Sequence, residues 1–231
     1  MKKIGLIGGI GPESTLIYYK KLVYGLQQRV DEHFFPRITI ESLNVFDVLR
    51  YCEQKDDQGL TTYLMQAIHN LTLSGAEIVA LTGNTPHMVF AELQKHSVVP
   101  LISIVQTTCD EAINLGLKKV GLLGTKFTMK HHFFKQPFIE AGIEVSVPTE
   151  DEIEYIGQKI STELELGIVN QDTQSAFIQI IENLVSKHQI DAIILGCTEL
   201  PLLFEHAQLP LLCLDTLQLH IQAIMNQAMQ N

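Results

Sequence analysis

Short apolar runs alternate along the chain with longer stretches in which apolar residues recur every three or four positions. Several short runs are apolar throughout, which is typical of parallel strands covered by helices on both faces. We predict strands at residues 3–8, 37–43, 77–82, 99–104, 119–124, 143–147, 191–196 and 209–214. We predict helices at residues 12–28, 60–73, 104–115, 150–166 and 173–187. This alternation indicates an α/β fold with mainly parallel sheets.

Residues at the expected helix starts agree with these assignments. Pro12 occupies the first position of the first helix, where its missing N–H costs nothing. Thr149 with Glu152 three residues later is a capping-box pattern. Asp215 can cap the last helix.

The two halves of the chain repeat the same strand ends. In each half one strand ends in glycines and hydroxyls, and a later strand ends in a polar residue followed by threonine. We infer two pseudo-symmetric lobes, residues 1–101 plus 215–231 and residues 102–214, each a mainly parallel sheet flanked by helices. Ligands of open α/β sheets bind outside the carboxyl ends of the strands. We therefore expect the active site in the cleft between the lobes.

Charge and hydropathy narrow the range of partners. The formal net charge of -10 disfavours nucleic acid and anionic membrane surfaces, which attract basic proteins. No apolar run approaches the roughly 20 residues of a membrane span. The first apolar run is interrupted by glycines and stops at Pro12, so we interpret it as a strand, not a signal peptide. These observations predict a cytoplasmic protein with a small-molecule substrate.

The chain has four cysteines, none in a Cys-x-x-Cys pair, and no His-Glu-x-x-His motif. This spacing predicts neither a metal site nor a disulfide scaffold. Cys109 and Cys213 have apolar neighbours and are expected core residues, while Cys52 has no evident role. Cys197 differs, because it follows an apolar strand and precedes an expected helix.

Cys197 is the strongest candidate for chemistry. A helix N-terminus favours a thiolate, so we expect its pKa to lie below the free value of about 8.5. A buried structural cysteine is the alternative, since cysteine is often buried. The neighbours Gly196 and Thr198, which do not form an apolar lining, favour a functional thiol.

Three further strand ends carry weaker candidates. The glycines of residues 8–12 fit neither a dinucleotide fingerprint nor a P-loop; they either offer backbone N–H groups to a small anion or simply turn the chain. Asn84 and Thr85 can donate to a ligand, and Thr85 can cap a helix start; the two roles are compatible. Thr125 and Thr128 add two hydroxyls beyond another strand.

Taken together, these motifs resemble the aspartate/glutamate racemase family of cofactor-independent amino-acid racemases. The resemblance extends over nearly the whole chain and rests on residues 4–9 with 11–15, 84–87, 122–125 with 128–129, 195–201, and Asp215 with His220. It implies two pseudo-symmetric lobes, usually in a homodimer, with the substrate between them and with neither PLP nor another cofactor.

The resemblance also implies roles for single residues. In the family two thiols face opposite sides of the substrate α-carbon, and one removes a proton while the other returns one. Cys197 matches the second thiol, whereas Gly83 stands at the position of the first and cannot transfer a proton. Arg50 matches a ligand of the side-chain carboxylate. The remaining matched substrate-binding positions are Gly9, Pro12, Asn84, Thr85, Thr125, Thr128 and Thr198.

Departures from the family pattern leave several functions open. Glu199 replaces the histidine of glutamate racemases, which favours the aspartate branch, yet residues 167–177 lack the lysine that some aspartate racemases place there. We expect an amino-acid racemase in which Cys197 serves one face and a threonine hydroxyl or water near Gly83 the other. The arylmalonate decarboxylases of this superfamily combine such a glycine with one cysteine, so a one-thiol decarboxylase or isomerase is an alternative. A non-catalytic binder of a small dicarboxylate or amino acid is the third hypothesis.

Overall fold

The computed structural model describes residues 1–205 and 207–230. The chain forms two compact units: unit 1 contains Met1–Ile104 and His220–Asn231, and unit 2 contains Val105–Leu219. The sequence placed the corresponding boundaries after residues 101 and 214. Residue 231, the end of the expected N-terminal lobe, and residue 206 lie outside the described residues.

Unit 1 is built on a four-stranded parallel sheet in the order β2-β1-β3-β4. Its strands are β1 (Ile4–Gly8), β2 (Ile38–Ser42), β3 (Ile78–Leu81) and β4 (Leu101–Ile102). All residues of β1 and β3 are buried, whereas the edge strand β2 is only partly covered. The runs that are apolar throughout thus form the centre of the sheet, as their pattern predicted.

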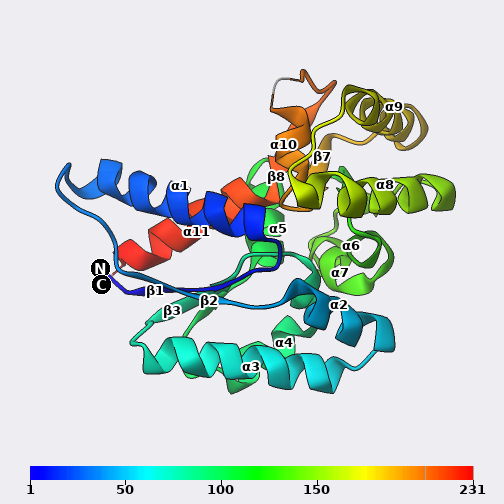
Figure 1. Cartoon of the computed structure of the whole chain (residues 1–231). Helices are drawn as coiled ribbons and strands as arrows, with labels where there is room; N and C mark the ends of the chain where they lie inside the picture. Colours follow the sequence, from blue (N-terminus) through cyan, green and yellow to red (C-terminus); the bar gives the residue numbers. More distant parts are fainter. Residues whose placement is uncertain (206, 231) are drawn as a thin grey trace. The chain divides into compact units, whose positions relative to one another are not determined.

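Helices cover both faces of this sheet. They are α1 (Pro12–Val30), α2 (Val45–Gln54), α3 (Asp57–Leu73), η1 (Thr85–Val89), α4 (Phe90–His96) and the unit 1 part of α11 (Thr216–Met229). Figure 1 shows α1 beside α11 on one face, and α3 on the other. Arg29 of α1 donates from Nη1 to Oδ1 of Asn226 at 2.8 Å, which joins the two helices.

Unit 2 repeats the arrangement with a parallel sheet in the order β6-β5-β7-β8. Its strands are β5 (Lys119–Gly124), β6 (Glu144–Ser146), β7 (Ala192–Gly196) and β8 (Leu212–Asp215). In both units the first strand lies between the second and the third, and the fourth lies at the edge beside the third. The predicted α/β fold with two similar, mainly parallel sheets is confirmed.

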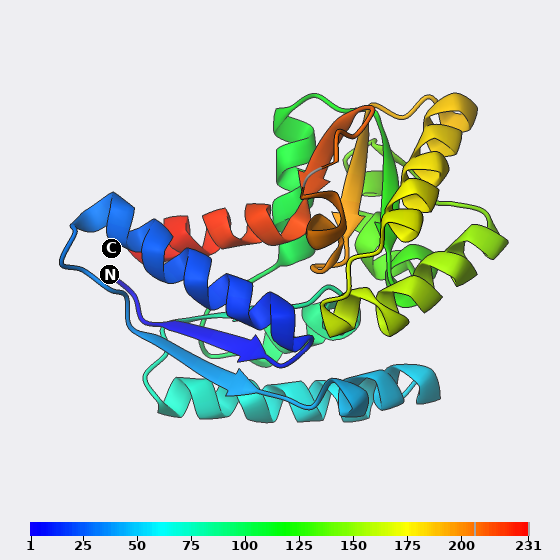
Figure 2. The same ribbon diagram turned by 45° about the horizontal axis from the view of Figure 1, so that its top comes forward.

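The helices of unit 2 are α5 (Ile104–Asn114), α6 (Lys126–Lys130), α7 (His132–Glu140), α8 (Glu150–Thr162), η2 (Leu164–Leu166), α9 (Gln171–His188) and α10 (Leu200–Phe204). Figure 2 shows α9 along one face of the sheet and α5 on the other side of the strands. No helix in the described part of the chain is long and apolar enough to span a membrane.

The helix starts predicted at residues 12, 104 and 150 are confirmed, whereas α3 and α9 begin three and two residues before the predicted positions 60 and 173. Pro12 begins α1, and Thr149 and Glu152 form a complete capping box at the start of α8. The Asp215 carboxylate accepts from the backbone N–H of Gln218 at 3.0 Å. The helix predicted at residues 150–166 instead ends at Thr162, because the chain tightens into η2 and Gly167 then takes a left-handed φ of 70°.

Candidate active site

In unit 1, the loop between β1 and α1 closes tightly over the first turn of α1. The Thr15 hydroxyl accepts from the N–H of Gly9 at 2.9 Å and donates to the carbonyl of Gly11 at 2.9 Å. Gly9 has φ of 78°, and a Cβ there would lie 2.1 Å from the carbonyl oxygen of Leu43. Only glycine fits this turn, in which the Gly9 N–H is bonded to Thr15 and Pro12 starts the helix.

Gly83 lies directly beneath this loop. A Cβ added to Gly83 would lie 2.6 Å from the carbonyl oxygen of Ile10 and 3.3 Å from its Cγ2 atom. A side chain at position 83 therefore requires the backbone of the β1–α1 loop to move. The sequence identified Gly83 as the position of a missing thiol, but it did not show that the loop occupies the space of that side chain.

The hydroxyl next to Gly83 is bonded to the main chain. Thr82 is fully buried, and its Oγ1 donates to the carbonyl of Ile7 at 3.1 Å. Ser14 lies within 3.1 Å of the Thr82 carbonyl and donates to it or to Gly11. These hydroxyls hold the ends of β1 and β3 to the start of α1.

Asn84 and Thr85 follow as a buried turn. Asn84 occupies the N-cap position of η1, one residue before the cap that the sequence suggested, and Thr85 is its first residue. The Asn84 carbonyl accepts from the N–H of His87 at 3.0 Å, which closes the turn. Gly83, Asn84 and Thr85 are thus brought together at the carboxyl end of β3.

In unit 2, two glycines end the central strands side by side. Gly124 of β5 pairs with Gly196 of β7. A Cβ on Gly124 would lie 2.9 Å from the Gly196 carbonyl oxygen, and one on Gly196 would lie 2.8 Å from that of Leu123. Because both positions lack a side chain, the strands stay paired up to the residues Thr125 and Cys197 that follow them.

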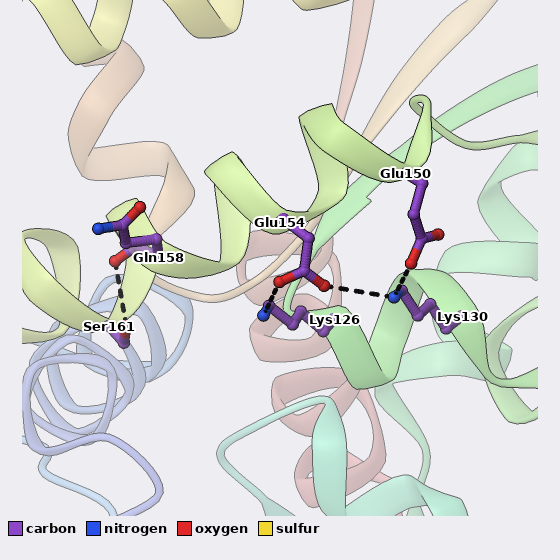
Figure 3. A network of polar contacts seen from close by, with 6 residues as sticks. All are labelled: Lys126, Lys130, Glu150, Glu154, Gln158 and Ser161. Atoms are coloured by element: carbon purple, nitrogen blue, oxygen red, sulfur yellow. Dashed lines mark hydrogen bonds and ion pairs between the residues drawn. The ribbon is translucent and has the colours of Figure 1, made fainter.

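Thr125 is the N-cap of α6. Its Oγ1 accepts from the N–H of Thr128 at 3.2 Å and lies 3.1 Å from the Thr128 hydroxyl. Figure 3 shows how α6 is joined to α8: Lys126 pairs with Glu154, and Lys130 pairs with Glu150 and Glu154. These ion pairs are half-exposed, so they add little to the free energy of unfolding. Their main effect is to orient the five-residue helix α6 against α8.

The Cys197 thiol is buried and faces a carboxylate. Its Sγ donates to Oε2 of Glu199 at 3.0 Å, and the Thr198 hydroxyl donates to the same oxygen at 3.0 Å. Only 5% of Cys197 is exposed. Burial, followed by the charge of Glu199, raises the pKa of the Cys197 thiol well above its ordinary value.

The expectation that a helix N-terminus lowers this pKa is wrong. The helix that follows, α10, starts at Leu200, and Glu199 occupies its N-cap position. The carboxylate of Glu199 accepts a hydrogen bond from the thiol, and its negative charge opposes any effect of the helix dipole. With burial acting in the same direction, Cys197 is a protonated thiol at neutral pH.

A second acid, which the sequence gave no motif to identify, belongs to the same cluster. Glu165 lies in η2, where burial and then the charge of Glu199 raise the pKa of its carboxyl. The charge of Glu165 also contributes to the raised pKa of Cys197. The environment of the thiol is therefore negative.

Arg50, the expected ligand of the side-chain carboxylate, lies on α2. Its Nη2 lies 2.9 Å from Oδ1 of Asp47, one turn earlier on the same helix. Its guanidinium carbon lies 5.5 Å from the ring centre of Tyr51. The side chain is 54% exposed, so a substrate carboxylate would compete with Asp47 for it.

The similarity to known proteins decides the family. A family model of Asp/Glu/hydantoin racemases matches residues 7–224. The chain belongs to this racemase family. Members of the family are racemases, a class of isomerase, and both strand-end clusters described above lie within the matched range.

Individual relatives of this racemase-family chain cover nearly all of it. The broad specificity amino-acid racemase RacX of Bacillus subtilis (strain 168) is 26% identical over 220 residues, 92% of each protein. An aspartate racemase homologue from Pyrococcus horikoshii OT3 is 35% identical, with a TM-score of 0.85 and both chains covered in full. A candidate Asp/Glu racemase from Yersinia pestis is 30% identical, with a TM-score of 0.90 and the same coverage.

The other cysteines of this racemase-family chain are held as thiols by burial. Burial, then nearby acids, raises the pKa of Cys52 and of Cys109 to about 11. The same causes raise the pKa of the partly exposed Cys213 to about 12. Within residues 1–205 and 207–230, no group of three or more His, Cys, Asp or Glu side chains is placed to hold a metal ion.

Proposed function

We propose that the chain is an amino-acid racemase that works without PLP and moves the α-proton of its substrate through Cys197. The observation that carries the proposal is the bond between the buried Cys197 thiol and Glu199. Family membership and the similarity to a broad specificity amino-acid racemase support it. We propose aspartate, glutamate or a related amino acid as the substrate.

In the proposed mechanism the Cys197 thiol is both a proton donor and, after losing its proton, a base. As donor, the thiol gives its proton to the α-carbanion, and the thiolate that remains takes a new proton from solvent. As base, Cys197 first passes its proton to the Glu199 carboxylate, and the thiolate then takes the α-proton. A thiol with a raised pKa yields a strongly basic thiolate, which suits abstraction from a weak carbon acid.

Negative charge on the α-carboxylate must be stabilised as the proton leaves. We assign this role to Asn84 and Thr85 of unit 1 and to Thr125 and Thr198 of unit 2, whose amide, hydroxyl and backbone N–H groups can donate to an oxyanion.

On the second face of the substrate, Gly83 supplies no proton-transferring group. The Thr82 hydroxyl donates to the Ile7 carbonyl, so it is poorly suited to accept a substrate proton. We therefore propose that Thr85 or a water molecule near Gly83 exchanges the proton on that face. Proton transfer there would be slow, because neither group is a strong base at neutral pH.

A one-thiol decarboxylase or isomerase is the second candidate, favoured by the close approach of the β1–α1 loop to Gly83. The contact that a Cβ would make with the Ile10 carbonyl shows a loop fitted to glycine. A lyase needs Cys197 only to protonate a carbanion formed when carbon dioxide leaves. This chemistry uses a single thiol and needs no group at position 83.

Chiral chromatography of a mixed L- and D-amino-acid panel tests the proposal. We expect inversion of at least one amino acid by the wild type and by Cys213→Ser, which keeps Cys197, but not by Cys197→Ser. Stereospecific release of carbon dioxide from a substituted malonate, without inversion of any amino acid, would establish the lyase instead. Thermal stabilisation by an amino acid that is never turned over would indicate a binding protein.

A further inference from the structure

Two buried histidines lie where the chain leaves and re-enters unit 1. The chain passes into unit 2 after Ile104 and returns to unit 1 at His220. His87 contacts the first connection and His220 is the first residue of the second. Both imidazoles bond to the short segment that contains Ile102 and Ile104.

The hydrogen bonds of His87 define its tautomer. The backbone N–H of Ile104 donates to Nε2 at 3.2 Å, so Nε2 carries no proton. Nδ1 lies 2.9 Å from the Gly83 carbonyl oxygen, which can only accept, so Nδ1 carries the proton. A neutral imidazole therefore joins the Gly83 turn to the first connection.

His220 has the opposite tautomer. Its Nε2 lies 2.9 Å from the Ile102 carbonyl oxygen and must donate to it. Its Nδ1 lies 2.8 Å from the Tyr18 hydroxyl, which donates to it from α1. The second connection is thus bonded to β4 and to α1.

The surroundings of the two rings favour the neutral forms. His87 stacks on Phe90 with ring centres 4.9 Å apart, and its ring centre lies 6.4 Å from that of His220. The polar groups bonded to the two rings are the Tyr18 hydroxyl and the backbone of Gly83, Ile102 and Ile104. The charge effect on the pKa of His87 comes from His220, whereas the pKa shift of His220 comes from burial, opposed by its bond to Ile102. Burial is the largest cause that lowers the pKa of His87 to about 3 and that of His220 to about 4.

We propose that His87 is a positioning residue, which fixes the Gly83–Asn84–Thr85 turn to Ile104 at the first connection. His220 fixes the second connection to Ile102, two residues before Ile104. We call the two neutral rings, with the atoms of Tyr18, Gly83, Ile102 and Ile104 that they bond, the histidine clamp. Its effect on catalysis rests on the proposed function, because the turn carries the expected substrate donors Asn84 and Thr85. Its existence does not depend on any activity.

The clamp explains why an imidazole is needed at position 87. One ring must donate to Gly83 and accept from Ile104 at the same time, which a neutral histidine does and an apolar residue cannot do. Asparagine places an amide N–H near the Nδ1 position and keeps the bond to Gly83. Glutamine places an amide oxygen near the Nε2 position and keeps the bond to Ile104. The two variants therefore remove one bond each.

The tautomers are tested on the wild-type protein by NMR with ¹⁵N-labelled histidine at pH 7 and pH 5. We expect Nδ1–H for His87, Nε2–H for His220, and neutral rings at both pH values. An Nε2–H tautomer of His87, or a charged ring at pH 5 for either histidine, would overturn the proposal. Because this measurement uses the wild-type protein without substrate, its outcome does not depend on the proposed function or on the stability of a variant.

Hydrogen exchange of His87→Asn and His87→Gln tests the positioning role, with the exposed His69→Gln as control. We expect exchange of the Ile104 amide to quicken about tenfold in His87→Asn, and exchange of the amide at position 87, which closes the turn, to quicken about tenfold in His87→Gln. For any substrate that is turned over, KM should rise more in His87→Gln than in His87→Asn. Equal effects of both variants at both amides would contradict the clamp, even if no racemase activity were found.

Discussion

The Cys197 thiol donates to the Glu199 carboxylate across 3.0 Å, and Thr198 donates to the same oxygen. A thiol held in this way is an acid with its own acceptor beside it. The pair can release a proton to the substrate and can accept one through the same atoms. This pair, and not a thiolate stabilised by a helix, is the centre of the chemistry that we propose.

Glu199→Gln should lower the pKa of the Cys197 thiol, because the negative charge that opposes the thiolate is removed. Glu165→Gln should lower it less, since Glu165 is the last and smallest of the causes that raise it. NMR titration with ¹³Cβ-labelled cysteine measures both shifts. Proton abstraction by Glu199→Gln should nevertheless be slower, since the thiol has lost its acceptor. An unchanged or higher pKa in Glu199→Gln would contradict this account of the site.

Gly83→Ala should destabilise unit 1, because the new Cβ meets the backbone oxygen of Ile10 at 2.6 Å. Overpacking of this kind costs about 1–3 kcal/mol, measured by urea unfolding. Gly116→Ala is the control: nothing lies within 4 Å of its added Cβ, and its φ of 69° tests left-handed strain alone.

Gly83→Cys restores the family thiol at the same steric cost. If the β1–α1 loop can move, two-base racemisation should increase despite lower stability. If the variant is as stable as the wild type, the β1–α1 loop accommodates a side chain at position 83. That result would contradict the steric conflict with Ile10.

Acid should destabilise the fold in a window set by the histidine clamp. His87 and His220 have folded pKa values of about 3 and about 4, below the ordinary value of 6.5. Between pH 6.5 and about 4 the unfolded chain binds protons that the folded chain does not, so stability falls as pH falls. Each histidine contributes about 1.4 kcal/mol per pH unit in this range.

Urea unfolding of the wild type and of His220→Gln at pH 7, 6 and 5 measures this dependence. The slope between pH 6 and pH 5 should be smaller in His220→Gln, which lacks one of the two groups. His69→Gln, an exposed position on α3, should keep the wild-type slope. The same slope in all three proteins would show that the clamp histidines are not neutral in the folded state.

The sequence predicted the sheets better than the short helices. Runs that are apolar throughout, such as the one in β7, have few alternatives to a buried strand. The helices α2, α4, α6, α7 and α10 lie outside the predicted helical ranges. The two shortest, α6 and α10, have five residues each, too few for a helical period to show. The family motifs located Cys197 and Gly83, which are strand-end positions that the fold places predictably.

What the sequence could not give depends on distances between atoms. The sign of the Cys197 pKa shift depends on where the Glu199 carboxylate points and on burial, and neither is a property of the motif. Glycine is required at position 83 because a Cβ there would meet the backbone of Ile10, which is far away in the sequence. The path of the loop that carries Ile10 cannot be derived from motif spacing. Glu165 belongs to no recognisable sequence motif. Only the folded structure brings its carboxyl close enough to affect Glu199 and Cys197.

The most direct test of the central claim is exchange of the substrate α-proton in heavy water, followed by proton NMR for L- and D-amino acids. The account predicts that the wild type exchanges the α-proton of at least one amino acid, that Cys213→Ser does so equally, and that exchange in Cys197→Ser falls by about a hundredfold or more. Exchange that is undiminished in Cys197→Ser would contradict the assignment of the proton transfer to this thiol.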